Sequence, residues 1–375
     1  GCETVVPLPY RGLGEIDVLL GVRRPYVVQF RNVAAVALCA FGKYVSCGIS
    51  AVYGGVTRAR VSSQCWKKAI RDSFKDFLPE TESGLRTKHV HELLTAAIRE
   101  RDPEAKAEKL AENMLKTAGL SLKNKNDKNE TGALFFISRG QLEALAELAV
   151  TVEKPDKKQC QDALKVNPAV DVALFGRMVA DDPSLNFDAA AQVAHAISTH
   201  AVQNEYDYFT AVDDCSPADN AGAGHLGTVE YNSATLYRYA TVNVTELEKS
   251  LGERTPEAVR AFAEAFIRSM PKGKINTFAN NVLPDAVYVT VRHDQPINLV
   301  GAFEMPVRAG QGGYVKPSVH ALTRHAQAVY HAYLGEPDQA FAIGEGMDEL
   351  VKETTTLPQL LDAVENSVKE IGGQA

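Results

Sequence analysis

The sequence has no stretch of about 18 apolar residues, which is the minimum that a membrane-spanning helix requires. Its first residues also lack the basic, apolar and small-residue order of a signal peptide. Its six cysteines show no C-x-x-C spacing, which argues against a zinc site and against a compact disulfide framework. We therefore expect a cytoplasmic protein with no membrane partner and no bound metal.

Several catalytic signatures are missing as well. The chain has no Walker loop, no nucleophile elbow, no H-E-x-x-H helix and no pair of catalytic carboxylates, and its nine histidines do not converge. Gly222, Gly224 and Gly227 formally match G-x-G-x-x-G, but that motif needs a strand before it and a helix after it. Here a β-like segment follows, so a loop at a hairpin tip explains the glycines better. We expect no enzymatic activity, no catalytic residue and no cofactor.

The chain has 375 residues, of which 45% are hydrophobic and 23% charged. It is therefore long enough to bury one large core or two smaller ones. Its formal net charge of −7 argues against nucleic-acid binding at first sight. Net charge is a property of the whole molecule, however, and phosphate contacts need only a local basic surface. The distribution of the charges therefore matters more than their sum.

Residues 1–50 are the least readable part of the chain. They contain three of the six cysteines and only four acidic or lysine side chains. The apolar runs at 16–20, 26–30 and 33–38 could form strands, but no turn residues organise them. We expect this segment to pack poorly, or to pair irregularly along the edge of a sheet.

Strands and helices alternate from residue 51 onward. The pattern predicts a helix from Ser62 or Ser63 to about 77, two helices within 86–120, and further helices after Ser138, at 156–165, after Thr245, after Thr255, at 318–334 and at 357–371. It predicts strands at 58–61, 133–137, 170–175, 236–244 and 285–292, a polar loop at 122–131, and a long glycine-tipped β-hairpin within 207–244. This order is typical of an α+β sheet domain interrupted by a helical insertion.

The densest group of basic residues surrounds the first of these helices. It consists of Arg58, Arg60, Lys67, Lys68, Arg71 and Lys75, with Asp72 as the only acid among them. Lys67, Arg71 and Lys75 follow one another at four-residue spacing and so share one helix face. The serines at the start of the helix add hydroxyl and free N–H groups where the helix dipole favours anions. A phosphate backbone suits this arrangement, although a solvated surface helix remains the alternative.

Four segments resemble, in the same order, the CasC family, which is the backbone subunit of the type I-E CRISPR Cascade complex. They are ARVSSQCWKKAIRDSF (59–74), VDVALFGRM (170–178), AHAISTHAVQNEYDYFTAVDD (194–214) and GHLGTVEYNSATLYRYATVNV (224–244). The resemblance covers most of the chain from residue 51 and weakens after about residue 270.

The resemblance implies an RRM-like (ferredoxin-like) palm with a helical finger insertion and a long β-hairpin thumb. The implied divisions are a palm at 51–85, fingers at 86–168, a second palm segment at 169–200, the thumb at 201–236, and palm with C-terminal helices at 237–375. Residues 1–50 should supply the first palm strand. The Asn-Arg-Asp-Asp segment of the family is not recognisable there, and Val56 replaces a basic residue expected after Gly54-Gly55. Either the segment supplies the strand by other means, or the recorded start is frameshifted or misassigned.

The function implied by the resemblance is structural. Copies of the subunit assemble head-to-tail along the crRNA, hold its backbone, and displace one nucleotide at a regular interval so that the guide can pair with target DNA in antiviral defence. The implied partners are crRNA, target DNA, further copies of the chain and the Cascade subunits CasA, CasB, CasD and CasE. An RRM-like RNA-processing nuclease and a sequence-specific DNA-binding regulator remain alternative functions.

The resemblance also assigns roles to residues. The crRNA-binding positions that it implies are Ser62, Gln64, Lys67, Arg71 and Met178, and the basic cluster itself adds Ser63, Lys68, Arg58 and Arg60. The implied thumb residues at the displaced nucleotide are Tyr208, Phe209, Thr210, Val212 and Leu226. Lys157 and Lys158 match a lysine-rich finger element that faces target DNA, although a solvated helix face is the usual role of such a run.

Overall fold

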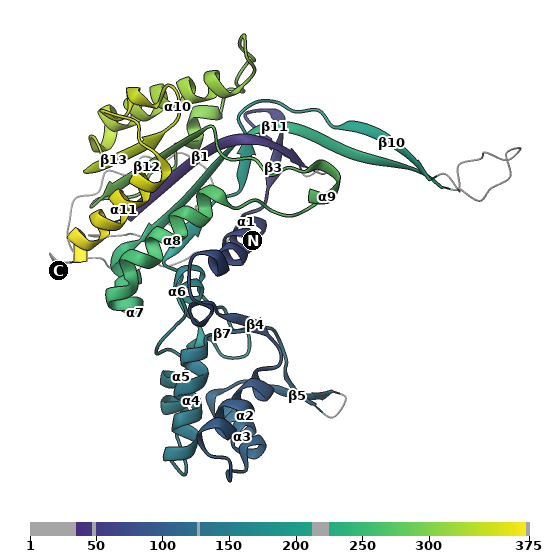
Figure 1. Ribbon diagram of the computed structural model, residues 1–375, viewed down its shortest axis with the longest axis vertical. Helices are drawn as coiled ribbons and strands as arrows, with labels where there is room; N and C mark the ends of the chain where they lie inside the picture. Colours follow the sequence, from purple (N-terminus) through teal and green to yellow (C-terminus); the bar gives the residue numbers. More distant parts are fainter. Residues whose placement is uncertain (1–34, 47–49, 126–127, 212–224, 373–375) are drawn as a thin grey trace, which may run out of the picture. The chain divides into compact units, whose positions relative to one another are not determined.

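The computed structural model describes residues 35–46, 50–125, 128–211 and 225–372. Within them, one antiparallel sheet contains nine strands: β1 (Ala35–Ser46), β2 (Ser50–Tyr53), β3 (Val56–Val61), β8 (Ala191–Val193), β9 (Ala196–Ser198), β10 (Glu205–Ala211), β11 (His225–Asn243), β12 (Ala286–Arg292) and β13 (Gln339–Ile343). The strand order is β13–β12–β1–β11–β9–β3–β2, and β8 and β10 also pair with β11. Figure 1 shows the long strands β1 and β11 at the centre of the sheet and β10 beside the outer part of β11. The predicted mixture of helices and sheet is confirmed.

Strand β11 organises this sheet. One of its edges pairs with all of β1, from Ala35 opposite Asn243 to Ser46 opposite Asn232. Its other edge pairs in turn with β10, β9 and β8. Because β1 also pairs with β12, residues 35–46 form a regular interior strand, and the expectation of irregular edge pairing is wrong for them. Residues 1–34 and 47–49 lie outside the described residues.

Helices cover both faces of the sheet (Figure 1). Along β12, Val287, Val289 and Val291 belong to one hydrophobic core, whereas Ala286 and Tyr288 belong to the other. The first core includes residues of α1 (Ser63–Ser73), α6 (Val170–Phe175), α7 (Val244–Leu251), α8 (Thr255–Arg268) and α11 (Leu357–Gly372). The second includes residues of the 3-10 helix Leu299–Phe303 and of α10 (Val315–Val329), which continues as a π-helical turn over Tyr330–Leu334.

The helical insertion has a hydrophobic core of its own. It contains α2 (Val90–Arg101), α3 (Ala107–Ala118), α4 (Arg139–Thr151) and α5 (Lys157–Ala163), and β4 (Leu85–Thr87) pairs there with β7 (Phe135–Ile137). Ser138 caps α4 and Asp156 caps α5, each in a capping box with a glutamine at the third helical position. The helices predicted within 86–120, after Ser138 and at 156–165 are therefore confirmed.

Short elements complete the described chain. They are the four-residue helix α9 (Ile275–Phe278) and the 3-10 helices Phe74–Asp76, Glu80–Glu82, Pro183–Leu185, Gly252–Arg254 and Met347–Glu349. In the ranges that the structure describes, no helix is both long and apolar enough to cross a membrane.

Three local predictions are wrong. The segment 122–131 is not a loop, because β5 (Leu122–Lys125) pairs with β6 (Lys128–Thr131). Thr131 is buried and Leu122 packs on the insertion core, so both ends are anchored.

The helix expected to begin at Thr245 is α7, and its cap is Asn243, whose side chain accepts the N–H of Glu246.

The third wrong prediction concerns 170–175, which form the helix α6 and not a strand. A short apolar run is compatible with a buried helix as well as with a buried strand. Val170 and Leu174 face the main core, whereas Val172 packs beside Phe136, so the apolar side chains surround a helix that is buried on several sides. Gly176, at a φ of 70°, ends the helix.

Arg58 lies inside the protein, which corrects its assignment to the nucleic-acid surface. Its side chain is fully buried and donates from Nε to the Tyr53 carbonyl, from Nη1 to Ser198 and from Nη2 to Phe303, at 3.1, 3.0 and 2.8 Å. Burial lowers the pKa of its guanidinium. The residue therefore joins β2, β9 and the Leu299–Phe303 turn.

Replacing Arg58 with methionine should lower the free energy of unfolding by about 3 kcal/mol, because three buried carbonyl groups lose a charged donor. The measurement is the midpoint of urea unfolding followed by circular dichroism. The matched control is Arg139→Met: Arg139 is exposed and pairs only with Glu143 among the described residues, so its loss should cost no more than about 0.5 kcal/mol. Equal losses in the two variants would contradict the structural role of Arg58.

Candidate nucleic-acid interface

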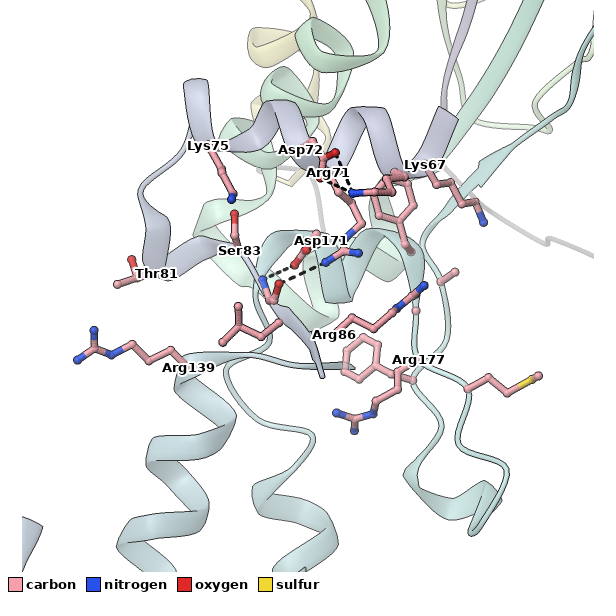
Figure 2. Close-up of a pocket in the computed structure, with 18 of the residues that line it drawn as sticks. Lys67, Arg71, Asp72, Lys75, Thr81, Ser83, Arg86, Arg139, Asp171 and Arg177 are labelled. Atoms are coloured by element: carbon pink, nitrogen blue, oxygen red, sulfur yellow. Dashed lines mark hydrogen bonds and ion pairs between the residues drawn. The ribbon is translucent and has the colours of Figure 1, made fainter. Parts of the chain in front are cut away.

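A cleft of about 1210 Å³ lies between helix α1, strand β4 and the segment that follows α6 (Figure 2). Seven lysines and arginines line it against four carboxylates, so its local charge is positive although that of the whole chain is negative. The basic residues are Lys67, Lys68, Arg71, Lys75, Arg86, Arg139 and Arg177. Of the positions predicted to bind crRNA, the cleft brings together Gln64, Lys67, Lys68, Arg71 and Met178.

The start of α1 is less open than the sequence suggested. Ser62 caps the helix as predicted, and its hydroxyl accepts the N–H of Cys65 at 3.2 Å. The N–H of Ser63 donates to Nδ1 of His195 at 3.0 Å. Two N–H groups expected to be free for an anion therefore have partners within the protein.

Lys67 and Lys75 are the cations of α1 and its extension that remain available. Both line the cleft on one side of the helix, as the four-residue spacing predicted. Within the described part of the chain, neither has a carboxylate at ion-pair distance, whereas Lys68 pairs with Asp72 at 2.9 Å. The Lys67 ammonium lies 5.9 Å from the centre of the Phe175 ring, and burial followed by the charge of Arg86 lowers its pKa.

Arg71 is half-buried and forms an ion pair with a buried carboxylate. Its Nε donates to Oδ2 of Asp171 at 2.9 Å, and its guanidinium lies 4.3 Å from the centre of the Phe136 ring. Asp171 is 1% exposed and accepts the N–H of Gly84 at 2.7 Å. Burial raises the pKa of Asp171, and the charge of Arg71 opposes that rise. The first role of Arg71 is therefore to neutralise a buried carboxylate that joins α1 to α6.

Arg177 and Met178 are neighbours with opposite environments. Arg177 is buried, donates to the carbonyls of Leu185, Phe136 and Leu164, and has its pKa lowered to about 10 by burial. Met178 is 83% exposed and lines the cleft. The buried arginine fixes the backbone from which the methionine reaches into solvent.

Sequence reasoning missed Arg86 of β4. Its side chain is exposed, lines the cleft, and places its guanidinium 5.1 Å from the centre of the Phe136 ring. Burial, followed by the charge of Arg71, lowers its pKa. No sequence signal brings Arg86 to α1, because its position follows from the pairing of β4 with β7, which lies 50 residues later in the chain.

Three other basic positions lie outside the cleft. Arg60 is half-buried in β3, opposite Ile197. Lys157 pairs with Asp182 at 2.7 Å and holds the pKa of that carboxyl well below its usual range. Lys158 is exposed on α5. Their contacts with nucleic acid remain predictions.

The predicted hairpin is present as β10 and β11. Tyr208 pairs with Thr228, Phe209 with Gly227 and Thr210 with Leu226. All seven residues of β10 are exposed, Tyr208 by 73%, and Leu226 of the partner strand is 65% exposed. Val212, Gly222 and Gly224 lie outside the described residues.

Gly227 belongs to a strand and not to the hairpin tip, which corrects its expected place. A Cβ atom at this position would collide with the ring of Phe209, which lies across the strand. The glycine therefore gives the aromatic ring room to lie over the partner strand.

Within the described residues, no group of three or more histidine, cysteine or acidic side chains is arranged to hold a metal ion.

Comparisons with known proteins agree with one another. Residues 49–367 match the family described as CT1975-like protein. A solved chain from a CRISPR RNA-guided surveillance complex, pre-nicking, is 29% identical with a TM-score of 0.74, and the similarity covers 89% of this chain and 100% of that one. A second, from a CRISPR RNA-guided surveillance complex, is 25% identical with a TM-score of 0.65 over 89% and 99% of the two chains. No curated protein matches.

Replacing Arg71 with alanine should destabilise the protein by about 3 kcal/mol at pH 7, because Asp171 is left as an uncompensated buried charge. The loss of stability should become smaller as the pH falls. Burial already raises the pKa of Asp171, and without Arg71 the folded variant takes up a proton there sooner than the unfolded chain does. Urea unfolding at several pH values measures both effects.

The control for this variant is Lys68→Ala, which removes an exposed ion pair of the same helix. Its effect should stay within about 1 kcal/mol. A loss in Arg71→Ala that is independent of pH would show that the Asp171 charge is not what Arg71 compensates.

Proposed function

This chain belongs to the CT1975-like protein family, and from that premise we propose that it is a CasC-type backbone subunit of a type I-E CRISPR surveillance complex. In this role it binds crRNA along the phosphate backbone and catalyses no reaction. The observation that carries the proposal is the cleft. Lys67 and Lys75, which have no carboxylate at ion-pair distance among the described residues, line it together with an exposed apolar side chain, Met178.

The chemistry of the cleft suits a nucleic-acid backbone. Lys67 and Lys75 would bind phosphates, and such contacts fix position without reading sequence. Met178 would touch the bases through dispersion, which does not distinguish one base from another. Sequence specificity then belongs to pairing between guide and target, as in other RNA-guided systems.

We assign the parts of the fold accordingly. The sheet with its covering helices acts as an RRM-like palm, residues 86–168 as the fingers, and 201–236 as the thumb. Partners of this assembly are crRNA, target DNA, further copies of the chain head-to-tail, and the subunits CasA, CasB, CasD and CasE. The separate hydrophobic core of the insertion supports its treatment as a distinct part.

The thumb displaces one nucleotide of the guide–target duplex at each subunit. Its exposed side chains Tyr208, Phe209 and Leu226 offer apolar surface to unstacked bases, and stacking on such surface lowers the cost of distorting a duplex. Exposed apolar surface of this kind is typical of interaction sites, so we expect a partner to cover the hairpin in the assembly.

Replacing Lys67 and Lys75 together with alanine should weaken binding to unrelated RNA sequences about equally, because the contacts are to phosphates. The slope of log affinity against log salt should fall by about one to two units. Fluorescence anisotropy of labelled RNA over 50–200 mM salt measures both effects. Arg71 is left intact because of its ion pair with Asp171.

The matched control removes two lysines outside the cleft, Lys249 and Lys352, and so changes the net charge equally. It should preserve the salt slope. If the variant lost affinity for only one RNA sequence, or if the control lost as much affinity, the phosphate backbone would not be bound by Lys67 and Lys75 in the cleft.

Replacing Phe209 and Leu226 with alanine should leave the RNA affinity of a single copy within a few-fold, because neither residue lines the basic cleft. In the assembled complex, the regularly spaced reactive nucleotides of the guide–target duplex should disappear when the duplex is probed chemically. Val282→Ala with Leu283→Ala, which trims exposed apolar residues elsewhere, is the control. Persistence of the regular pattern in the hairpin variant would refute the displacement role.

A further inference from the structure

Two guanidinium groups lie over the ring of Phe136. Phe136 is 2% exposed, and the guanidinium carbons of Arg71 and Arg86 lie 4.3 and 5.1 Å from its centre. Arg71 has its counterion in Asp171. Among the residues that the structure describes, Arg86 has neither an ion pair nor a side-chain hydrogen-bond acceptor. Arg71 is therefore paired directly with Asp171, whereas that carboxylate acts on Arg86 only at a longer distance.

A third cation, Lys67, shares this part of the cleft. Figure 2 shows Lys67 of α1 and Arg86 of β4 on the same side of the Arg71–Asp171 pair, with Lys75 and Arg139 on the other side. The charge of Arg86 contributes to the lowered pKa of Lys67, and the charge of Arg71 contributes to that of Arg86. Arg86 thus has a cationic neighbour on each side, and an anion placed between Lys67 and Arg86 would relieve their repulsion.

We infer that Arg86 is a phosphate-binding residue, which holds the nucleic-acid backbone from the insertion side of the cleft while Lys67 holds it from α1. This inference rests on the proposed function and adds a contact to it. Arginine suits the task because its planar guanidinium can bind two phosphate oxygens at once. The contact with the Phe136 ring restricts the position of the guanidinium before the ligand arrives, so less side-chain freedom is lost on binding.

A consequence for the two parts of the protein follows. Lys67 belongs to a helix that packs on the sheet, whereas Arg86 belongs to a strand that pairs with β7 of the insertion. A backbone held by both residues connects sheet and insertion through the ligand. Arg86 therefore makes the insertion part of the RNA site and not only a support for its own helices.

The test compares Arg86→Gln with Arg99→Gln. Both arginines belong to the insertion and are exposed, but Arg99 lies outside the cleft and pairs with Glu108 at 2.8 Å. Arg86→Gln should weaken the binding of single-stranded RNA severalfold and lower the salt slope by roughly 0.7, which corresponds to one phosphate contact on a single strand. Arg99→Gln should leave both quantities unchanged. Arg86→Lys, which keeps the charge, should restore most of the slope.

A second measurement needs no variant. Modification of the full chain with an arginine-selective dicarbonyl reagent, read by peptide mass spectrometry, should show Arg86 protected by bound RNA and Arg99 still reactive. An RNA affinity and slope unchanged in Arg86→Gln, or no protection of Arg86, would overturn the inference while leaving the proposed function intact. Failure of the unmodified chain to bind RNA would instead refute the proposed function, and the inference with it.

Discussion

The buried carboxylate of Asp171 is the constraint on which the geometry of the cleft depends. An ionised carboxylate away from water is costly unless charges or hydrogen-bond donors compensate it. Asp171 meets that requirement with Arg71 of α1 on one oxygen and the N–H of Gly84 on the other. The helix α6 must therefore meet two segments that precede it by 87 and 100 residues, and that meeting forms a wall of the cleft. Gly84 can approach Asp171 so closely because it has no Cβ atom. A Cβ atom at this position would collide with the side chains of Phe136 and Val172.

Burial separates the basic residues into two groups. Arg58, Arg177 and Arg238 are buried and donate to backbone carbonyls, and burial lowers the pKa of Arg238 to about 9. The five donors of a guanidinium can satisfy several carbonyl groups at once, which the ammonium of a lysine cannot do in a fixed plane. Lys67 and Arg86, in contrast, line a positively charged cleft without a carboxylate partner among the described residues. Counts of charge cannot reveal this division, since both groups contribute equally to the net charge.

Local signals and long-range contacts explain which features could be predicted from the sequence. The caps Ser138 and Asp156 act within one helical turn, so the helices that they begin were predictable. The hairpin was predictable because alternation is also local, and the place of Gly227 was not, since it depends on the cross-strand ring of Phe209. The helix α6 was misread as a strand because a short apolar run leaves both possibilities open.

Contacts between distant segments explain the other differences. Arg58 lies in a basic cluster of the sequence, but partners up to 245 residues away bury it. Arg86 carried no signal, since the pairing of β4 with β7 brings it to the cleft. For β1, the interior position follows from the two strands that flank it, β11 and β12, and not from any pattern in residues 35–46.

The hairpin that is proposed to displace bases can act as a wedge only if its base resists bending. Strand β11 runs without a break from the hairpin into the sheet, where it pairs with β1. Beside that transition, the N–H of Thr235 donates to Nε2 of His200 at 3.1 Å. Because a backbone N–H is always a donor, Nε2 must accept, and Nδ1 therefore carries the proton and donates to the Ala201 carbonyl at 2.9 Å. Burial lowers the pKa of His200 and keeps the ring in this neutral form, and the ring also stacks on Tyr314 at 3.6 Å. One tautomer of a single histidine thus connects the base of the hairpin to the sheet and to the start of α10. These contacts oppose bending of the hairpin when a base presses on its exposed aromatic residues.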